Sequence, residues 1–258
     1  MRGYGAPTMT TPPRYQAPAL KKGLEILELL ATSEEALTMS DISAALGRSV
    51  GEIFRMLQVL EEHRYIARHD EGYRLTNRLF ALGMGRPPVR DLTVTALPVM
   101  QGLARATGQS CHLAVASGAE MVVIAGVEAP GLSGFAVRVG YRRPLHRSNS
   151  GRVLLAFQPA PIRAAMLDEI REAGSDLDPS LDKQLDALVT TGDAVTPSPM
   201  LEGITDLSAP VLEHGAARAA LTVPFVAGRA ARVSLEETRA LLRDAVRSVS
   251  AQLQPTID

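Results

Sequence analysis

The stretch "LTMSDISAALGRSVGEIFRMLQVLEEHRYI", residues 37–66, decides the fold of the N-terminal part of the chain. Thr38 and Asp41 have the spacing of a helix capping box, and so do Ser49 and Glu52. Each box opens a helix, and a glycine ends the first one after two turns. Two helices joined by a three-residue turn predict a helix-turn-helix. Each helix has an apolar side that faces a core: Ile42, Ala45 and Leu46 in the first, and Ile53, Leu57 and Leu60 in the second.

The segments on either side extend this motif. Helical spacing of apolar residues precedes it over residues 20–31, and two short β-like runs follow it, "YIAR" (65–68) and "YRLT" (73–76), around the turn "HDEG". Helix, helix, tight turn, helix and hairpin is the order of a winged helix-turn-helix, which we assign to residues 19–76. Residues 1–18 are rich in Pro, Thr and Gly and are predicted to form a flexible tail.

The second helix of the motif carries a mixed outer face that suits the major groove of B-DNA. Gly51 allows close approach of the backbone, and the Ser49 hydroxyl lies beside free N–H groups that favour phosphate. Polar side chains can contact phosphates or bases, apolar ones can touch thymine methyls, and Glu52 either caps the helix or accepts from cytosine N4. The hairpin adds basic side chains, including His69. The predicted DNA contacts are Ser49, Val50, Gly51, Glu52, Phe54, Arg55, Gln58, Arg68 and Arg74.

Charge argues against strong DNA binding by a single copy. Acidic residues outnumber basic ones between Leu20 and Leu75, whereas phosphate contacts by Lys and Arg supply most non-specific affinity. A dimer would double the contacts, with Arg14, Lys21 and Lys22 assisting. The alternative is a ligand-sensing protein that acts through protein contacts without binding DNA.

The remainder of the chain predicts an α+β domain with a largely antiparallel sheet, residues 108–258. A linker helix region, residues 77–107, precedes it, and Pro98 should break or bend that helix. Periodicity predicts strands at 111–117, 121–127, 134–140, 204–211 and 217–226. It predicts helices at 151–157, 161–172, 181–190 and 234–253, the last one opened by a Ser-Leu-Glu-Glu capping box.

Three blocks of the chain resemble the IclR family of bacterial transcription regulators. "ALKKGLEILELL" (19–30) with residues 37–66 is similar to the winged helix of that family. "VGYRRPLHRSNSGRVLLAF" (139–157) and "GITDLSAPVLEHG" (203–215) with "AALTV" (219–223) resemble its C-terminal motifs. The resemblance implies a GAF-like effector domain with a small-molecule pocket on one face of its sheet. It also implies assembly into homodimers or dimers of dimers, and effectors that are small organic acids or aromatic catabolites.

By the motifs of the family, Asn149, Ser150, Asp206, Ser208 and Thr222 line the effector pocket, and Arg138 could neutralise a carboxylate. The residues themselves suit an anion, since Ser148–Ser150 begin a helix whose free N–H groups favour negative charge. The same serines could merely cap that helix, and Asp206 could be a surface charge. We interpret His112 and His146 as structural histidines with satisfied hydrogen bonds.

Composition narrows the class of protein. A chain of 258 residues with 46% apolar and 21% charged residues can bury a sizeable core. The single cysteine, Cys111, excludes an intramolecular disulfide, and neither a secretory signal nor a membrane-spanning run is recognisable. No nucleophile elbow, P-loop, dinucleotide fingerprint or zinc spacing occurs. We therefore predict a cytoplasmic protein that is not an enzyme and has no cofactor or metal. We further expect effector binding to change how the linker helices pair the DNA-binding heads.

Overall fold

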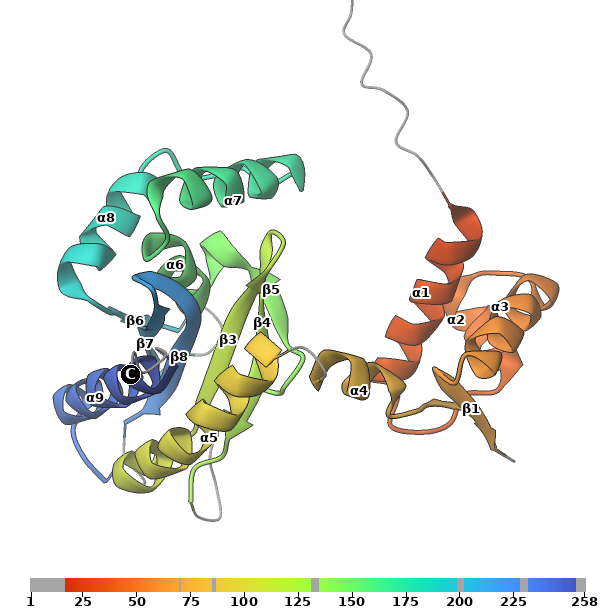
Figure 1. The fold of residues 1–258 in the computed structure, drawn as a ribbon, viewed down its shortest axis with the longest axis horizontal. Helices are drawn as coiled ribbons and strands as arrows, with labels where there is room; N and C mark the ends of the chain where they lie inside the picture. Colours follow the sequence, from red (N-terminus) through yellow and green to blue (C-terminus); the bar gives the residue numbers. More distant parts are fainter. Residues whose placement is uncertain are drawn as a thin grey trace, which may run out of the picture. The chain divides into compact units, whose positions relative to one another are not determined.

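The computed structural model describes residues 17–69, 71–84, 87–130, 135–198, 202–227 and 232–253. The chain forms two compact units, residues 1–86 and 87–258 (Figure 1). Residues 1–16 of the predicted tail lie outside the described residues, and Pro18 is already the first residue of a helix. The predicted linker region, residues 77–107, is divided between the two units.

The first unit has the predicted order of helices and strands. It contains α1 (Pro18–Thr32), α2 (Met39–Leu46), α3 (Val50–Glu62), β1 (Ile66–His69), β2 (Gly72–Leu75) and α4 (Arg78–Met84). Both capping boxes form as predicted, and Gly47 ends α2 in the left-handed conformation. The inward sides of the helices and hairpin meet in one core of Ile26, Leu30, Ile42, Ile53, Leu57, Ile66 and Tyr73.

The β1–β2 hairpin is the wing of this unit, and it is tied to the loop before α2. Leu37 and Tyr73 exchange two backbone hydrogen bonds, with N···O distances of 3.1 and 2.8 Å. Gly72 makes this approach possible. It has a φ of +140°, and a Cβ atom there would lie 2.5 Å from the Leu37 carbonyl carbon. Only glycine fits such a position.

The described part of the second unit contains a six-stranded, fully antiparallel sheet in the order β5-β4-β3-β8-β7-β6. Its strands are β3 (Cys111–Ser117), β4 (Glu120–Val127), β5 (Arg142–Pro144), β6 (Ala194–Pro197), β7 (Ile204–Glu213) and β8 (Ala216–Val226). Its helices are α5 (Pro87–Thr107), the 3₁₀ turn η1 (Leu145–Arg147), α6 (Asn149–Ala156), α7 (Ala160–Glu172), α8 (Leu181–Thr191) and α9 (Leu235–Leu253). The α+β fold class is thus as predicted.

Helices cover both faces of this sheet, because successive residues of a strand point to opposite sides. Leu113 packs with α5 and α9 in one core cluster, whereas its neighbour Ala114 packs with α6, α7 and α8 in another. Figure 1 shows the same division, with α5 and α9 on one side of the sheet and α6 to α8 on the other. The α6 side is the one that holds the cavity described below.

Two predictions about individual segments need correction. Residues 135–139 are not a strand; the third strand is β5, Arg142–Pro144, which follows a left-handed turn at Gly140. The turn redirects the chain, so that residues 135–138 border the cavity instead of extending the sheet. Of the break or bend predicted at Pro98, the break does not occur, because α5 runs without interruption from Pro87 to Thr107. Proline removes one backbone hydrogen-bond donor, and packing of the apolar side of α5 on the sheet offsets this loss. The packed residues are Leu92, Ala96, Met100, Leu103 and Ala104.

A buried ion cluster joins α9 to the loop between α8 and β6. The Asp193 carboxylate, with its side chain 1% exposed, accepts two hydrogen bonds from Arg239 at 2.9 and 2.8 Å. It accepts a third from Arg243 at 2.6 Å. Burial raises the pKa of Asp193, but the hydrogen bonds from Arg239 and Arg243 outweigh it and hold the pKa below its ordinary value. No described helix is long and apolar enough to cross a membrane.

Candidate functional site

Helix α3 presents an outward side that the core of its own unit does not use. Ile53 and Leu57 are buried, whereas Val50, Phe54 and Val59 are 47%, 44% and 49% exposed. Gly51, Arg55 and Gln58 are exposed beside them. A Cβ atom at Gly51 would meet nothing within 4 Å, so none of the described residues of this unit requires a glycine there. This side is free to meet a partner.

Glu52 differs from the other predicted DNA contacts because both of its carboxylate oxygens are engaged. Oε2 accepts from the Ser49 backbone N–H at 3.3 Å and from its hydroxyl at 3.0 Å. Oε1 accepts from Lys22 Nζ at 2.5 Å. These hydrogen bonds, that of Lys22 first, lower the pKa of Glu52 to about 2. Glu52 is therefore a capping residue with a fixed charge, and Lys22, which was expected to assist DNA binding, is held by it.

Part of the unfavourable charge of this unit is neutralised internally. Arg48 and Lys21 lie 3.3 and 3.8 Å from the Glu25 carboxylate. Arg55, in contrast, forms no ion pair with any residue that the structure describes. The cation at the centre of the outward side of α3 thus remains available for a phosphate or a base.

The predicted wing contacts are exposed. The Arg68 guanidinium lies 6.0 Å from the centre of the Tyr73 ring, and Arg74 lies 4.0 Å from the Glu71 carboxylate. His69 is the last residue of β1 and is exposed as well. Exposed interactions of this kind are weak, so both arginines can exchange them for contacts with phosphate oxygens.

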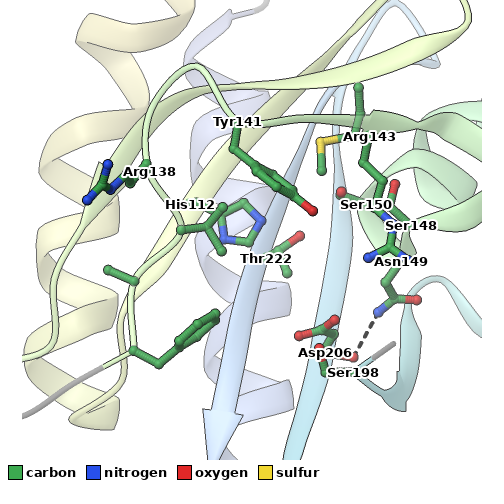
Figure 2. A pocket seen from close by; sticks show the side chains of 14 residues that line it. His112, Arg138, Tyr141, Arg143, Ser148, Asn149, Ser150, Ser198, Asp206 and Thr222 are labelled. Atoms are coloured by element: carbon green, nitrogen blue, oxygen red, sulfur yellow. Dashed lines mark hydrogen bonds between the residues drawn. The ribbon is translucent and has the colours of Figure 1, made fainter. Parts of the chain in front are cut away.

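The second unit contains a cavity of about 230 Å³ between the sheet and the start of α6. Figure 2 shows polar side chains converging on it from β3, β5, α6, β7 and β8. Its lining has an apolar part and a polar part: Met121, Phe135, Ala136, Val137 and Tyr141, and His112, Arg138, Arg143, Ser148, Asn149, Ser150, Ser198, Asp206 and Thr222. Such a combination is typical of a small-molecule site.

The beginning of α6 forms one wall of the cavity. The Ser148 hydroxyl accepts from the Gly151 N–H at 3.0 Å and so caps the helix. Gly151 packs so closely on η1 that a Cβ atom would lie 2.2 Å from the Leu145 carbonyl oxygen. Asn149 is buried, and its amide donates to the Asp206 carbonyl at 2.8 Å and to the Ala194 carbonyl at 3.2 Å. Asn149 therefore locks α6 to β6 and β7 in addition to lining the cavity.

Of the predicted pair on β7, the structure brings only Asp206 to the cavity. Burial raises the pKa of Asp206, and the Ser198 hydroxyl and the Arg143 charge oppose that shift. Ser208 is 0% exposed and is the cross-strand partner of Thr222 on β8, with the two hydroxyl oxygens 2.7 Å apart. Contrary to expectation, Ser208 is not among the residues that line the cavity, and its side chain is fully buried. Thr222 and Ser150 line the cavity as expected.

Sequence reasoning missed Arg143. Its side chain is half-buried in the cavity wall and forms no ion pair with a described residue. Arg138, the predicted cation, also lines the cavity but is exposed. A less hydrated cation interacts more strongly with an anion, so Arg143 is the better candidate to hold a carboxylate. No local pattern in the sequence singles out Arg143. Arg142 is its direct neighbour, yet only Arg143 lines the cavity.

The remaining candidate residues are two histidines, His112 and His146, and the single cysteine. His112 lines the cavity, and burial lowers its pKa to about 4. His146 lies outside the cavity and accepts a hydrogen bond from Arg147 at its Nε2 atom, 3.2 Å away. Both have a buried Nδ1 atom without a partner among the described residues, so the prediction of satisfied histidines is wrong. Burial raises the pKa of the Cys111 thiol to about 12. No group of three His, Cys, Asp or Glu side chains in the described ranges could hold a metal.

Comparison with known proteins gives a consistent result. Residues 19–70 match the IclR helix-turn-helix domain, and residues 88–251 match the bacterial transcriptional regulator IclR C-terminal domain. The glycerol operon regulatory protein of Streptomyces coelicolor is 30% identical over 246 residues, which cover 91% of this chain and 96% of that protein. The transcriptional repressor AllR of Klebsiella pneumoniae is 26% identical, with coverage of 98% and 96%.

Solved structures share the fold. An IclR homolog from Microbacterium hydrocarbonoxydans, complexed with 4-hydroxybenzoate, has a TM-score of 0.75 at 24% identity and covers 91% of this chain and 98% of its own. The Thermotoga maritima IclR has a TM-score of 0.62 at 25% identity, with coverage of 91% and 98%. The relatives and matched domains are regulators of transcription rather than enzymes. With an N-terminal helix-turn-helix and a C-terminal effector domain, this chain belongs to the IclR family of bacterial transcriptional regulators.

Proposed function

We propose that this regulator binds a double-stranded DNA operator through α3 and the β1–β2 wing of paired copies, and that a small organic acid in the cavity changes its operator affinity. The observation that carries the proposal is the division of α3 into two sides. One side is committed to the core, and the other exposes a glycine, a glutamine and an arginine that forms no ion pair with a described residue, where base edges would lie.

Pairing of copies follows from the charge of the first unit. Acidic residues outnumber basic ones between Leu20 and Leu75, and Lys21, Lys22 and Arg48 are engaged in ion pairs within the unit, so a single unit has a limited number of phosphate contacts to offer. A homodimer or a dimer of dimers would multiply these contacts and place two α3 helices on half-sites about 34 Å apart, or a multiple of that distance. Such a protein works in the cytoplasm, where its operator is.

Three features of the cavity support a carboxylate effector. Arg143 is a half-buried cation that forms no ion pair with a described residue, although the charge of Asp206 acts on it. Ser148–Ser150 begin a helix whose N-terminus favours negative charge. The apolar side chains around Phe135 suit a hydrocarbon body. The relative complexed with 4-hydroxybenzoate has the same fold, which extends the candidates to aromatic acids.

Coupling between the two sites would act through the spacing of the DNA-binding heads. Effector binding between α6 and the sheet would shift the equilibrium between head arrangements. Typical coupling free energies of about 1–3 kcal/mol change operator affinity roughly 5- to 150-fold.

The test is operator binding measured by fluorescence anisotropy, with DNA from upstream of the gene for this protein, with and without a panel of carboxylic acids. Replacing Arg55 and Gln58 by alanine should abolish specific binding. Arg143→Ala should leave DNA binding intact and remove the response to the acid. Arg142→Ala is the matched control, because Arg142 is exposed and pairs with Glu120. If no fragment binds, or if the Arg55 and Gln58 variant binds normally, the protein acts without DNA recognition by α3.

A further inference from the structure

His112 lies in the cavity wall without a hydrogen-bond partner. Its side chain, on β3, is 6% exposed. Neither ring nitrogen forms a hydrogen bond with any residue in the described part of the chain, and Nδ1 is fully enclosed. Nε2 is then the nitrogen left to meet a molecule in the cavity. Buried polar side-chain atoms are paired in the large majority of cases, so a buried imidazole in a cavity wall, with no partner at either nitrogen, is a candidate to bind a ligand through Nε2.

The state of the ring decides which chemical group it can recognise. Because burial lowers the pKa of His112 to about 4, the imidazole is neutral at physiological pH. A neutral imidazole has one N–H donor and one acceptor nitrogen. It cannot neutralise a carboxylate, but it can form a hydrogen bond with a hydroxyl group, which both donates and accepts.

Two of the polar groups near His112 already have partners of their own. Thr222, the cross-strand partner of His112, has its hydroxyl 2.7 Å from that of Ser208. The Asp206 carboxylate interacts with the Ser198 hydroxyl and with the Arg143 charge. Figure 2 shows the His112 ring across the cavity from Arg143. A molecule held by its carboxylate at Arg143 therefore extends its other end toward His112.

We propose that His112 recognises a hydroxyl group of the effector, so that the cavity selects hydroxylated carboxylic acids over the matching acids without the hydroxyl. This inference rests on the proposed function, since it assumes that an organic acid occupies the cavity.

Isothermal titration calorimetry of the full-length protein with matched pairs of acids tests it. The pairs are 4-hydroxybenzoate with benzoate, 4-hydroxyphenylacetate with phenylacetate, and lactate with propionate. The wild type should bind the hydroxylated member of the pair that fits about 5- to 10-fold more tightly, the range expected for one hydrogen bond to an otherwise unpaired buried group. His112→Phe should reduce this preference to about onefold. His112→Gln keeps an amide near the position of Nε2 and should retain part of it.

Nitrogen NMR of histidine-labelled wild-type protein gives a second readout that needs no substitution in the cavity. The hydroxylated acid should shift the His112 ring nitrogens, and its partner without the hydroxyl should not. His146 is the internal control, because it is also buried with an unpaired Nδ1 but lies outside the cavity. Its signals should stay in place with either acid. The His112 signal is assigned by its loss in His112→Gln.

The possible outcomes separate the two proposals. If the wild type binds acids without a hydroxyl preference, or if the preference persists in His112→Phe, the role of His112 is refuted while acid binding stands. The same holds if the preference is lost in Asp206→Asn and kept in His112→Phe, because the hydroxyl then contacts Asp206. If no acid of the panel binds the wild type, the proposed effector class fails and the hydroxyl selection fails with it.

Discussion

Removal of the Asp193 carboxylate tests whether the buried ion cluster holds α9 in place. Asp193→Ala deletes three charge-assisted hydrogen bonds. Loss of one partner from a fully buried pair costs about 3–5 kcal/mol. The side chains of Arg239 and Arg243 are 29% and 42% exposed, however, and regain water once the carboxylate is gone. We therefore expect a loss of about 2–3 kcal/mol.

Thermal unfolding of the full-length protein, followed by circular dichroism, measures this loss. For a unit of this size, each kcal/mol lowers Tm by about 2–4 °C, so the second unit should melt roughly 4–12 °C earlier. Asp168→Ala is the matched control. Its carboxylate pairs with Arg171 on the surface of α7, where the side chain is 69% exposed. Such a pair contributes about 0–1 kcal/mol.

The pH dependence gives an independent check. Because the folded pKa of Asp193 is depressed, its contribution is fully present above the unfolded value of about 4 and is lost as pH falls through the folded value. The difference between wild type and Asp193→Ala should thus shrink below about pH 4. Equal Tm losses for Asp193→Ala and Asp168→Ala, or a difference that persists in acid, would refute the reasoning.

Three further predictions follow from single positions. Gly51→Ala should stabilise α3 by about 0.5–1 kcal/mol but weaken operator binding, if the backbone approaches DNA there. The control is Gly83→Ala in α4, where a Cβ atom also meets nothing within 4 Å and only stability should increase. Equal DNA affinity of the two variants would contradict the close approach. Gly151→Ala should destabilise the second unit by about 2 kcal/mol or more in a denaturant titration, because its Cβ meets the Leu145 carbonyl oxygen at 2.2 Å, whereas Gly102→Ala should not. The wild type should lose stability on the order of 3 kcal/mol as pH falls from 6.5 to 4, since the depressed pKa of His112 lets only the unfolded chain take up that proton. This slope should flatten in His112→Gln, and an unchanged slope would show that other groups cause it.

The sequence by itself determined those helices and strands that depend on residues close together in the chain. The capping boxes at Thr38 and Ser49 involve residues three positions apart, and the period of Ile53 and Leu57 fixes which side of α3 turns inward. The exposed face of α3 and the antiparallel pairing of β3 with β4 follow from the same short-range patterns. That is why the winged helix-turn-helix and the class of the second domain could be predicted.

Only the tertiary structure decided the membership of the cavity. Alternation along β7 predicts that Asp206 and Ser208 lie on the same face of the sheet. It does not predict which of the two side chains reaches the cavity. Arg143 reaches the cavity from β5 and His112 reaches it from β3, and the other lining residues come from strands and helices far apart in the chain. Likewise, Lys22 meets Glu52 across 30 residues. Contacts of this kind arise from how the helices and strands pack, and no short-range pattern in the chain encodes them.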